Sequence, residues 1–320
     1  MKLSICIPSY NRAAYLKSFL EKLFLEIEHN SFQNTVEVIV SDNCSPDDTP
    51  AICSEFIGRG LIYTRNQENI GPDANFLKLF SLAQGEYIWL PGDDDTFCDG
   101  LITYILSTAE KEKFDYFYLR TMGEIAQPSS RSYSTVPNTE LFGRTTIFTT
   151  FMTSQVIKAA LIHPYIEEAK KYLGGYMAYY YIFAKALETA EICLISDQKE
   201  IHMTIENTGG YSFYKVWGDA VFASLYDTGF VKNKKLLSRF RLDMFLILIL
   251  PVTYKQRQGG GGNKFSATSE KFDVTKYFAG FWYSAFFSLY RKAPIPLVGM
   301  VHLGVRIFNK VRRLSFGAVC

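Results

Sequence analysis

The stretch Tyr87-Ile88-Trp89-Leu90-Pro91-Gly92-Asp93-Asp94-Asp95 joins a short apolar run to three consecutive carboxylates. The apolar run has the composition of a buried strand, and the carboxylates follow where that strand would end. Three adjacent like charges repel one another, and a divalent cation with oxygen ligands is the usual remedy. The stretch therefore predicts a strand that delivers a platform for a metal-bound diphosphate. A solvated acidic turn is the alternative if the run is considered alone.

Strand-like and helix-like segments alternate through the first 120 residues around this stretch. The alternation predicts a sheet of parallel strands joined by right-handed helical crossovers. Thr49 and Asp99 are expected to cap two of the helices. The expected strands cover residues 3–8, 36–41, 61–64 and 87–90, and the expected helices cover about 16–27, 49–56, 72–85 and 100–111.

Polar clusters follow each of the four expected strands, and a sheet of this kind binds ligands beyond the carboxyl ends of its strands. After the first strand, Tyr10 offers an aromatic face for a base and Arg12 a guanidinium for phosphate. After the second, Asp42 can accept a hydrogen bond from a base N–H. A polar loop over 65–75 and the Asp run complete the set. Four such clusters at one sheet edge indicate a nucleotide pocket.

These motifs resemble those of the inverting glycosyltransferase family 2, which has the GT-A fold. The matching segments are 7–12, 40–45, 69–71 with Asn75, and 85–95, in the family's order and spacing. The Gly-Asp-Asp-Asp ending looks most like the branch that contains abequosyltransferase-like enzymes of bacterial surface-polysaccharide synthesis. The resemblance implies an α/β fold of GT-A type, with a doubly wound, mostly parallel sheet flanked by helices.

The resemblance also implies the roles of individual residues. Gly92 stands where the family's acidic motif often has its first Asp, so the metal contact is expected first at Asp94 and then at Asp95. The implied metal is Mn²⁺ or Mg²⁺. The residues expected to bind the nucleotide sugar are Pro8, Tyr10, Arg12, Asp42, Asn69, Gly71, Asn75 and Asp93.

The second half of the chain departs from the family's pattern, because the expected acidic pair before a Gln-x-x-Arg-Trp-like motif is absent. The catalytic base stays unassigned, with Glu188 and Glu191 as weak candidates whose alternative is a helix-surface role. The tyrosine-rich segment 172–181 could stack on sugar faces, although helical spacing favours a core role. His202 could complete a metal shell, and a structural role is the alternative.

The C-terminal segment 274–320 contains seven basic residues, no acidic residue and many aromatic side chains, within a chain whose net charge is +2. This composition suits an anionic membrane surface better than a nucleic acid, and a packed helical pair with basic solvent faces is the alternative. No run reaches the length of about 20 apolar residues that a spanning helix needs. Domains are expected over 1–120 (nucleotide-sugar binding), 121–230 (acceptor binding) and 231–320 (helical extension), with a Gly-rich joint at 258–263.

The sequence therefore predicts metal-dependent, inverting transfer of a sugar from a nucleotide-diphosphate sugar to a saccharide acceptor. The acceptor is expected to be polyprenyl-linked, in O-antigen, capsule or exopolysaccharide synthesis. Six scattered cysteines without a CxxC pair and no signal-peptide pattern predict a cytoplasmic protein, peripheral on the inner membrane face. Two alternatives are a non-catalytic nucleotide-sugar-binding module and a sugar nucleotidyltransferase. The latter would need a Gly-rich basic loop that segment 8–12 lacks.

Overall fold

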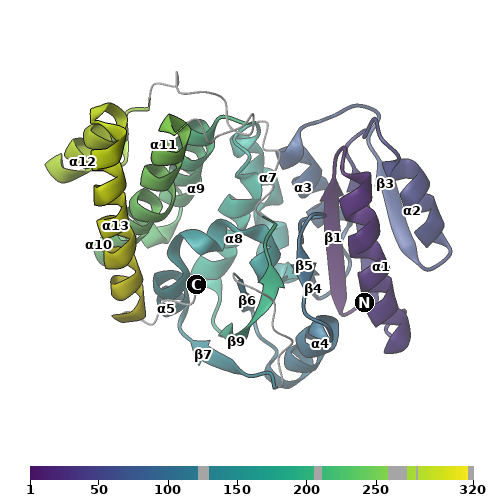
Figure 1. The fold of residues 1–320 in the computed structure, drawn as a ribbon. Helices are drawn as coiled ribbons and strands as arrows, with labels where there is room; N and C mark the ends of the chain where they lie inside the picture. Colours follow the sequence, from purple (N-terminus) through teal and green to yellow (C-terminus); the bar gives the residue numbers. More distant parts are fainter. Residues whose placement is uncertain (122–129, 205–210, 259–271, 279, 316–320) are drawn as a thin grey trace. The chain divides into compact units, whose positions relative to one another are not determined.

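The computed structural model describes the chain except for residues 122–129, 205–210, 259–271, 279 and 316–320 (Figure 1). The described chain divides into two compact units. The first comprises Met1–Leu141 and Thr149–Ile205, and the second comprises Phe142–Phe148 and the residues from 206 to 319. Most of the expected Gly-rich joint lies outside the described residues.

The first unit is built on a nine-stranded sheet with strand order β3-β2-β1-β4-β8-β6-β9-β5, and β7 pairs with β9. The strands are β1 (Leu3–Ser9), β2 (Val36–Asp42), β3 (Leu61–Arg65), β4 (Tyr87–Trp89), β5 (Thr96–Phe97), β6 (Tyr116–Thr121), β7 (Tyr133–Val136), β8 (Gln155–Lys158) and β9 (Cys193–His202).

The first four strands are parallel, as the alternating pattern predicts. Ser9 is the register partner of Asp42, which in turn is the partner of Arg65. The carboxyl ends of β1, β2 and β3 are therefore level with one another. This register brings the polar clusters that follow these strands to one edge of the sheet.

The other half of the sheet is mixed and not mostly parallel. Strand β8 runs antiparallel to both β4 and β6, and β5 and β7 run antiparallel to β9. Only the β6–β9 pair in this half is parallel. The expected α/β architecture is confirmed. The alternation of strands and helices did not predict the antiparallel strands in the second half of the sheet.

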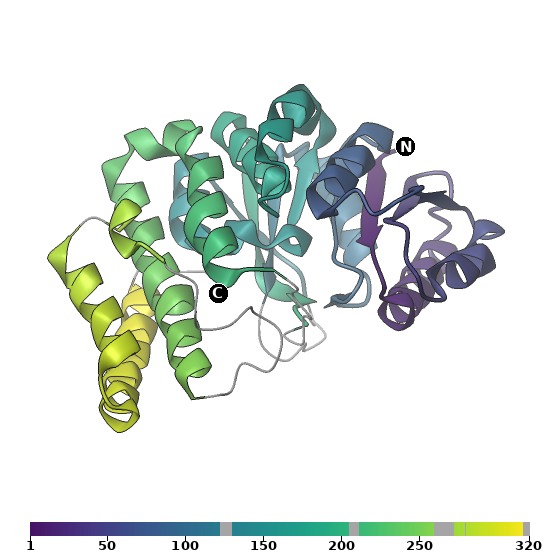
Figure 2. The same cartoon turned by 90° about the horizontal axis from the view of Figure 1, so that it is seen from above.

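Helices cover both faces of the first four strands (Figures 1 and 2). On one face, Ile5 and Val38 pack with Leu23 and Phe56 in the main hydrophobic core. On the other face, the Cys6 thiol donates to the carbonyl oxygen of Leu79 at 3.9 Å. The helices of this unit are α1 (Ala13–His29), α2 (Thr49–Ile57), α3 (Pro72–Leu82), α4 (Leu101–Glu112), α6 (Ala159–Ile162), α7 (Ile166–Ala169) and α8 (Ala178–Thr189), with short turns η2 (Met152–Ser154), η3 (His163–Tyr165) and η4 (Lys170–Tyr172).

Two expected helix caps are wrong. Asp48 rather than Thr49 precedes α2, and Gly100 rather than Asp99 precedes α4 in a left-handed conformation (φ 75°). The first turn of α4 is capped from α1, because the Glu26 carboxylate accepts from the backbone N–H of Ile102 at 2.8 Å and of Thr103 at 3.3 Å. A carboxylate at a helix N-terminus also interacts favourably with the helix dipole.

The tyrosine-rich segment belongs to the core, as its helical spacing favours. Tyr179, Tyr180 and Tyr181 are buried in α8. The N-terminus of α8 is held by Asp73 of α3, whose carboxylate accepts from the backbone N–H of Tyr176 at 2.8 Å and of Ala178 at 3.0 Å. Burial raises the pKa of Asp73, and these hydrogen bonds oppose that shift.

The second unit is helical and has an aromatic core. Phe222 stacks on Tyr277 with ring centroids 4.9 Å apart, and Tyr283 packs edge-on against Phe245 at 4.8 Å. The chain passes between the units within α5 (Asn138–Thr145) and η1 (Thr146–Thr150). The other elements are η5 (Lys215–Ala220), α9 (Val221–Tyr226), η6 (Gly229–Lys232), α10 (Lys234–Asp243), η7 (Met244–Ile249), α11 (Leu250–Arg257), η8 (Val274–Lys276), α12 (Phe281–Lys292) and α13 (Ile295–Ser315).

The aromatic side chains offered above for a membrane surface are therefore mostly core. Of the eight aromatic residues between positions 277 and 290, five are buried within the second unit: Tyr277, Phe278, Tyr283, Phe287 and Tyr290. Among the described residues, no helix combines the length and the apolar character needed to cross a bilayer.

Replacement of Glu26 by Ala is predicted to lower the free energy of unfolding by about 0.5–2 kcal/mol, because two N–H groups at the start of α4 lose their acceptor. Glu21→Ala, at an exposed position of the same helix, is the matched control and should stay within about 0.5 kcal/mol of the wild type. Urea unfolding measures both. Equal stability of the two variants would contradict the interhelical cap.

Candidate nucleotide and diphosphate site

The candidate site lies at the carboxyl ends of the parallel strands. The Asp run follows β4, and the backbone N–H of Asp95 donates to the Gly92 carbonyl oxygen in a tight turn at 3.4 Å. Segment 9–12 follows β1, and segment 42–45 follows β2. Parallel pairing of β1 with both neighbours brings these three loops together.

Asp93 and Asp94 share one guanidinium. Nη1 of Arg12 lies 3.0 Å from Oδ1 of Asp93 and 2.9 Å from Oδ2 of Asp94. The Ser9 hydroxyl donates to the second oxygen of Asp93 at 2.7 Å. Asp93 is buried, whereas the Asp94 side chain is 13% exposed. Arg12, expected from the sequence to reach phosphate, thus lies at the site with its charge directed at the Asp run.

Two residues that lie later in the sequence of the same unit, Thr153 and Thr204, hold the Asp95 carboxylate. The Thr153 hydroxyl in η2 donates to Oδ2 of Asp95, and the backbone N–H of Thr204 donates to Oδ1 at 3.2 Å. The Thr204 hydroxyl donates to the Asp94 carbonyl oxygen. Thr153 also accepts from the backbone N–H of Gly92 at 2.9 Å. These contacts fix the turn that carries the three carboxylates.

Gly92 explains the departure from the family's acidic motif. A Cβ atom at this position would lie 2.8 Å from Oδ2 of Asp95 and 3.0 Å from Oδ1 of Asp94. Any side chain would therefore displace the two carboxylates. Gly92 therefore leaves room for the Asp94 and Asp95 carboxylates where they lie.

Burial dominates the electrostatics of the Asp run. It raises the pKa of Asp95 to about 7, against the hydrogen bond from Thr153 and with the charge of Asp94 adding to the shift. It also raises the pKa of Asp93 to about 6, where the charge of Arg12 and the hydrogen bond from Ser9 oppose it. Burial disfavours the charged form of Arg12, but Asp93 and Asp94 outweigh it and raise the pKa of the guanidinium. The site is short of positive charge at neutral pH.

The Asp42 carboxylate is engaged by groups of the protein itself. Its side chain has no exposed surface, and both carboxylate oxygens are engaged. Oδ1 accepts from the backbone N–H of Ser45 at 2.8 Å, and Oδ2 accepts from the Tyr63 hydroxyl at 2.8 Å. Nε of Arg65 lies 3.6 Å from the same Oδ2. Asp42 therefore positions the loop after β2 in this structure, and its expected contact with a base N–H stays a prediction.

The expected ribose and diphosphate residues form a braced amide network. The buried Asn75 amide donates to the Ser41 carbonyl oxygen at 2.9 Å and accepts from the Ser41 hydroxyl at 2.7 Å. Asn69 accepts from the Asn43 amide at 2.8 Å and from the backbone N–H of Gly71 at 2.9 Å. Gly71 has φ 81°, a conformation that favours glycine and turns the loop into α3. Asn75 therefore shapes the site from beneath, and Asn69 lies at its surface.

Tyr10 lies on the loop that leaves β1, and Pro8 is the last residue but one of that strand. The Tyr10 side chain is 45% exposed, so its ring is available to a ligand. Its neighbour Asn11 has φ 56°, and the Asn11 backbone N–H donates to the Ser45 hydroxyl at 3.0 Å. Pro8 is half-buried opposite Ser41.

His202 lies near the Asp run, and the two candidate bases do not. His202 is the register partner of Thr96, which follows Asp95 in the chain. Glu188 pairs with Lys185 at 2.7 Å near the end of α8. Glu191 precedes β9, where its backbone N–H donates to Asp115 at 3.0 Å. That position is level with the amino ends of β4 and β6, the sheet edge opposite the Asp run.

The Asp run fits a hard divalent cation by its donor chemistry. Among the residues that the structure describes, no three His, Cys, Asp or Glu side chains gather as ligands. Mg²⁺ is, however, commonly bound through one or two carboxylates together with substrate phosphates. The partly exposed Asp94 suits such a contact. Asp95 is the adjacent carboxylate, and a bound cation would favour its charged form and so lower its raised pKa.

Several residues of this site have no distinctive sequence signal. Thr153 lies 58 residues from Asp95 in the sequence, and Thr204 lies 110 residues from Asp94, so neither belongs to a motif near the Asp run. Tyr63 lies inside a strand and carries no motif. Asn43 and Asn66 belong to polar loops that the sequence does identify, but their amide pairing at 2.9 Å needs the fold.

Comparison with known proteins agrees with this geometry. Residues 4–160 match the family model described as Glycosyl transferase family 2. Abequosyltransferase RfbV of Salmonella typhimurium is 38% identical over 117 residues, which are 34% of this chain and 34% of that protein. The GalNAc(5)-diNAcBac-PP-undecaprenol beta-1,3-glucosyltransferase of Campylobacter jejuni is 30% identical over 113 residues, 34% of this chain and 35% of that protein. Each alignment spans about a third of the relative's length.

A solved structure extends the likeness in fold. S. aureus TarS 1-349 in complex with UDP-GlcNAc has a TM-score of 0.60 with this chain, at 16% identity, over 78% of this chain and 73% of that one. The GT-A type α/β fold expected from the sequence is thereby confirmed. Residues 4–160 therefore form a glycosyltransferase family 2 domain.

Proposed function

We propose that the protein transfers a sugar from a nucleoside-diphosphate sugar to a hydroxyl of a saccharide acceptor, with inversion at the transferred carbon. The observation that carries this proposal is the buried Asp run with its single guanidinium, beside the exposed Tyr10 at the carboxyl edge of a parallel sheet. The names of the two glycosyltransferase relatives and the UDP-GlcNAc complex of TarS support it.

In the proposed reaction, Tyr10 stacks on the base and the amide network of Asn43, Asn69 and Asn75 keeps the loops around the ribose and diphosphate rigid. Arg12 is placed to exchange one carboxylate contact for a phosphate oxygen, since its Nη1 already lies between Asp93 and Asp94. Ser9, Thr153 and Thr204 hold the carboxylates in place while the leaving group departs. Most of the rate enhancement would come from such positioning and from charge stabilisation.

We further propose that Asp94 and Asp95 hold Mn²⁺ or Mg²⁺, with His202 as a further ligand candidate. When bound, such a cation neutralises charge that develops on the diphosphate leaving group. Deprotonation of the acceptor hydroxyl requires a base, and no described residue is assigned that role.

The acceptor is proposed to be a lipid-linked saccharide of surface-polysaccharide synthesis, reached from the inner face of the cytoplasmic membrane. The name of the Campylobacter jejuni relative, which includes PP-undecaprenol, supports this part of the proposal. The basic, acid-free segment from residue 274 onward also supports it.

A non-catalytic nucleotide-sugar-binding module is the second candidate, favoured by the position of Glu188 and Glu191 at the opposite sheet edge. Incubation with a panel of UDP-, dTDP- and CDP-sugars, with Mn²⁺ or Mg²⁺ and a membrane-lipid extract, separates the candidates. Acceptor-dependent release of nucleoside diphosphate supports the transferase. Binding without turnover in every combination supports the module.

Asp94→Asn is predicted to lower turnover a hundredfold or more, while the melting temperature stays close to the wild-type value. Loss of one carboxylate ligand of the metal costs roughly several kcal/mol of transition-state stabilisation. Asp99→Asn, an exposed carboxylate five residues away, is the matched control and should retain activity. Release of nucleoside diphosphate is the readout. Wild-type turnover of the Asp94 variant, or full activity in EDTA, would exclude the metal mechanism.

Tyr10→Ala is predicted to weaken UDP binding by about 1–3 kcal/mol, the usual contribution of base–aromatic stacking. Tyr10→Phe retains the ring and should bind within about 0.5 kcal/mol of the wild type. Isothermal titration calorimetry with UDP measures both. If the Ala variant binds as tightly as the Phe variant, the base does not lie on Tyr10.

Asp95→Asn is predicted to stabilise the metal-free protein, relative to the wild type, by about 1–3 kcal/mol more at pH 8 than at pH 5. A buried carboxyl with a raised pKa contributes stability that is fully present below the unfolded pKa near 4 and is lost as pH rises through the folded pKa of about 7. An Asn side chain does not ionise, so Asp95→Asn removes this loss of stability.

Thermal unfolding in EDTA between pH 5 and pH 8 tests the Asp95 prediction, again with Asp99→Asn as the control. A stability difference from the wild type that is independent of pH would show that Asp95 does not titrate in this range.

A further inference from the structure

Helix α13 exposes a continuous apolar stripe, defined by residues 300, 303, 307 and 311. Steps of three and four residues place these side chains on one face of a helix. Isolated exposed apolar residues are ordinary, but four in one row on a charged helix are not. Their exposed fractions are 67% for Met300, 59% for Leu303, 58% for Ile307 and 58% for Val311.

The opposite face fixes α13 to the second unit. Val298 and Val305 are buried there, and Arg312 pairs with the buried Asp243 of α10. The Tyr290 hydroxyl lies 3.1 Å from Nδ1 of His302. The helix is therefore held by its inner face, and the stripe points outward from a docked helix.

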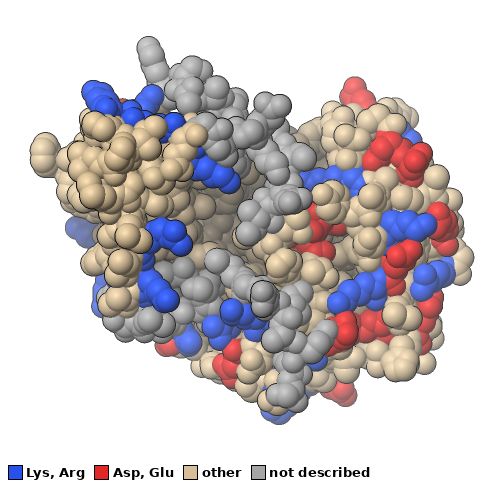
Figure 3. All heavy atoms as spheres, viewed as in Figure 1, with Lys and Arg blue, Asp and Glu red and all other residues tan. Residues whose placement is uncertain are grey.

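Basic side chains border the stripe. Arg306 and Lys310 are exposed on one flank of α13, and Arg291 and Lys292 are exposed at the end of α12. Segment 274–320 contains no Asp or Glu. On the face shown in Figure 3, acidic side chains gather mainly over the part of the first unit that holds β1 to β3. The charge around α13 is complementary to an anionic surface.

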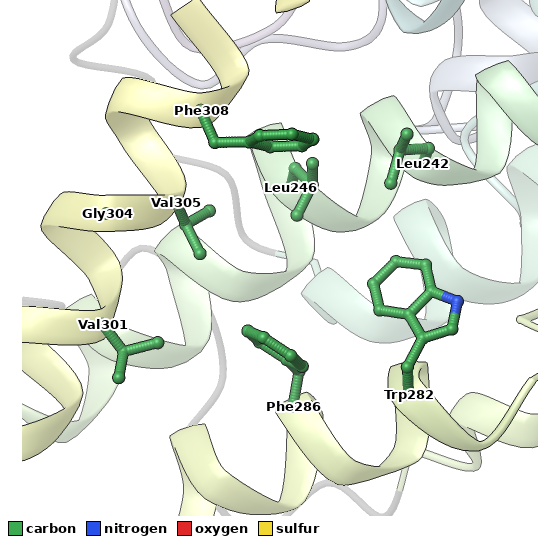
Figure 4. Close-up of a pocket in the computed structure, with 8 residues that line it drawn as sticks. All are labelled: Leu242, Leu246, Trp282, Phe286, Val301, Gly304, Val305 and Phe308. Carbon is green, nitrogen blue, oxygen red and sulfur yellow. The ribbon is translucent and has the colours of Figure 1, made fainter.

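An apolar groove borders the other flank of the stripe (Figure 4). Its volume is about 460 Å³, and Phe308 and Val301 of α13 line it together with Trp282 and Phe286 of α12 and Leu246 of η7. The groove and the stripe together make one apolar surface that runs around the outer side of α13. Apart from the indole N–H of Trp282, the described residues that line the groove have apolar side chains or none, which does not suit a sugar or a phosphate.

We infer that α13 lies in the interface of an anionic bilayer, with the stripe among the lipid chains and one hydrocarbon chain of a lipid in the groove. Interfacial helices combine an apolar face with Lys and Arg beside it, as α13 does. This inference deepens the membrane part of the proposed function and rests on it. It assigns the contact to α13 instead of the buried aromatic side chains of 277–290.

Flotation of the full chain with vesicles tests the stripe, using phosphatidylcholine vesicles with and without 30% phosphatidylglycerol as probes. We expect binding to anionic vesicles at low salt and its decrease at high salt. Leu303→Asp/Ile307→Asp should reduce the bound fraction at least tenfold. Leu25→Asp, which places one such charge on an equally exposed position of α1, should float like the wild type.

Arg306→Gln/Lys310→Gln provides a second variant that leaves the apolar stripe intact. It should bind several-fold less to anionic vesicles and show a weaker salt dependence. Both variants should melt like the wild type and still bind UDP in calorimetry, since α13 takes no part in the nucleotide site. Loss of flotation with retained UDP binding supports the inference, whereas absence of UDP binding in the wild type would contradict the proposed function alone.

Brominated lipid chains test the groove. They should quench the fluorescence of Trp282, and Trp282→Phe should remove most of the quenching. Unchanged flotation of the Leu303/Ile307 variant would overturn the membrane assignment. So would concentration-dependent self-association of the lipid-free wild type that the same variant abolishes, because the stripe would then bind a second copy of the chain.

Discussion

Among the described residues, three carboxylates at the end of β4 have one guanidinium beside them, and this imbalance of charge is the constraint on which the site depends. Arg12 reaches Asp93 and Asp94, while Asp95 is left to neutral donors, Thr153 and the backbone of Thr204. Burial then raises the pKa of Asp93 and Asp95 toward neutrality. A fold would not retain such a cluster for stability, because buried charges without full compensation are costly. The arrangement suits a site that receives a cation and an anionic ligand together.

Hydrogen bonds within the protein hold the loops beside the Asp run in place. Asp42 ties Ser45 to Tyr63, and the Asn43, Asn66 and Asn75 amides link the loops after β2 and β3. These groups are buried or paired within the protein, so they position the ligand surface without being part of it. The exposed Tyr10 and the partly exposed Asp94 are left to face the ligand. Asp42 supports this loop surface from within, and its contact with a base stays a prediction.

How much of this could be predicted from the sequence depends on how local each determinant is. The first four strands, their helices and the position of the Asp run follow from apolar periodicity and turn chemistry within short windows. The antiparallel strand β8, the cap that Glu26 gives to α4 and the contacts of Thr153 join segments that are distant in the chain, and no local pattern records them. Asp42 illustrates the same limit, because a motif identifies the residue but only packing decides which way its carboxylate faces.

The C-terminal segment shows the limit of composition in particular. Aromatic and basic residues together suggest a membrane surface, but their helical positions divide them between two roles. Tyr283, Phe287 and Tyr290 recur at spacings of four and three along α12 and are buried, whereas Met300, Leu303 and Ile307 recur in the same way along α13 and are exposed. Periodicity alone cannot distinguish a face that packs from a face that stays outside. The ion pair of Arg312 with Asp243 distinguishes the two faces of α13, because it holds the inner face against α10. The apolar stripe then points outward, between the basic flank and the groove.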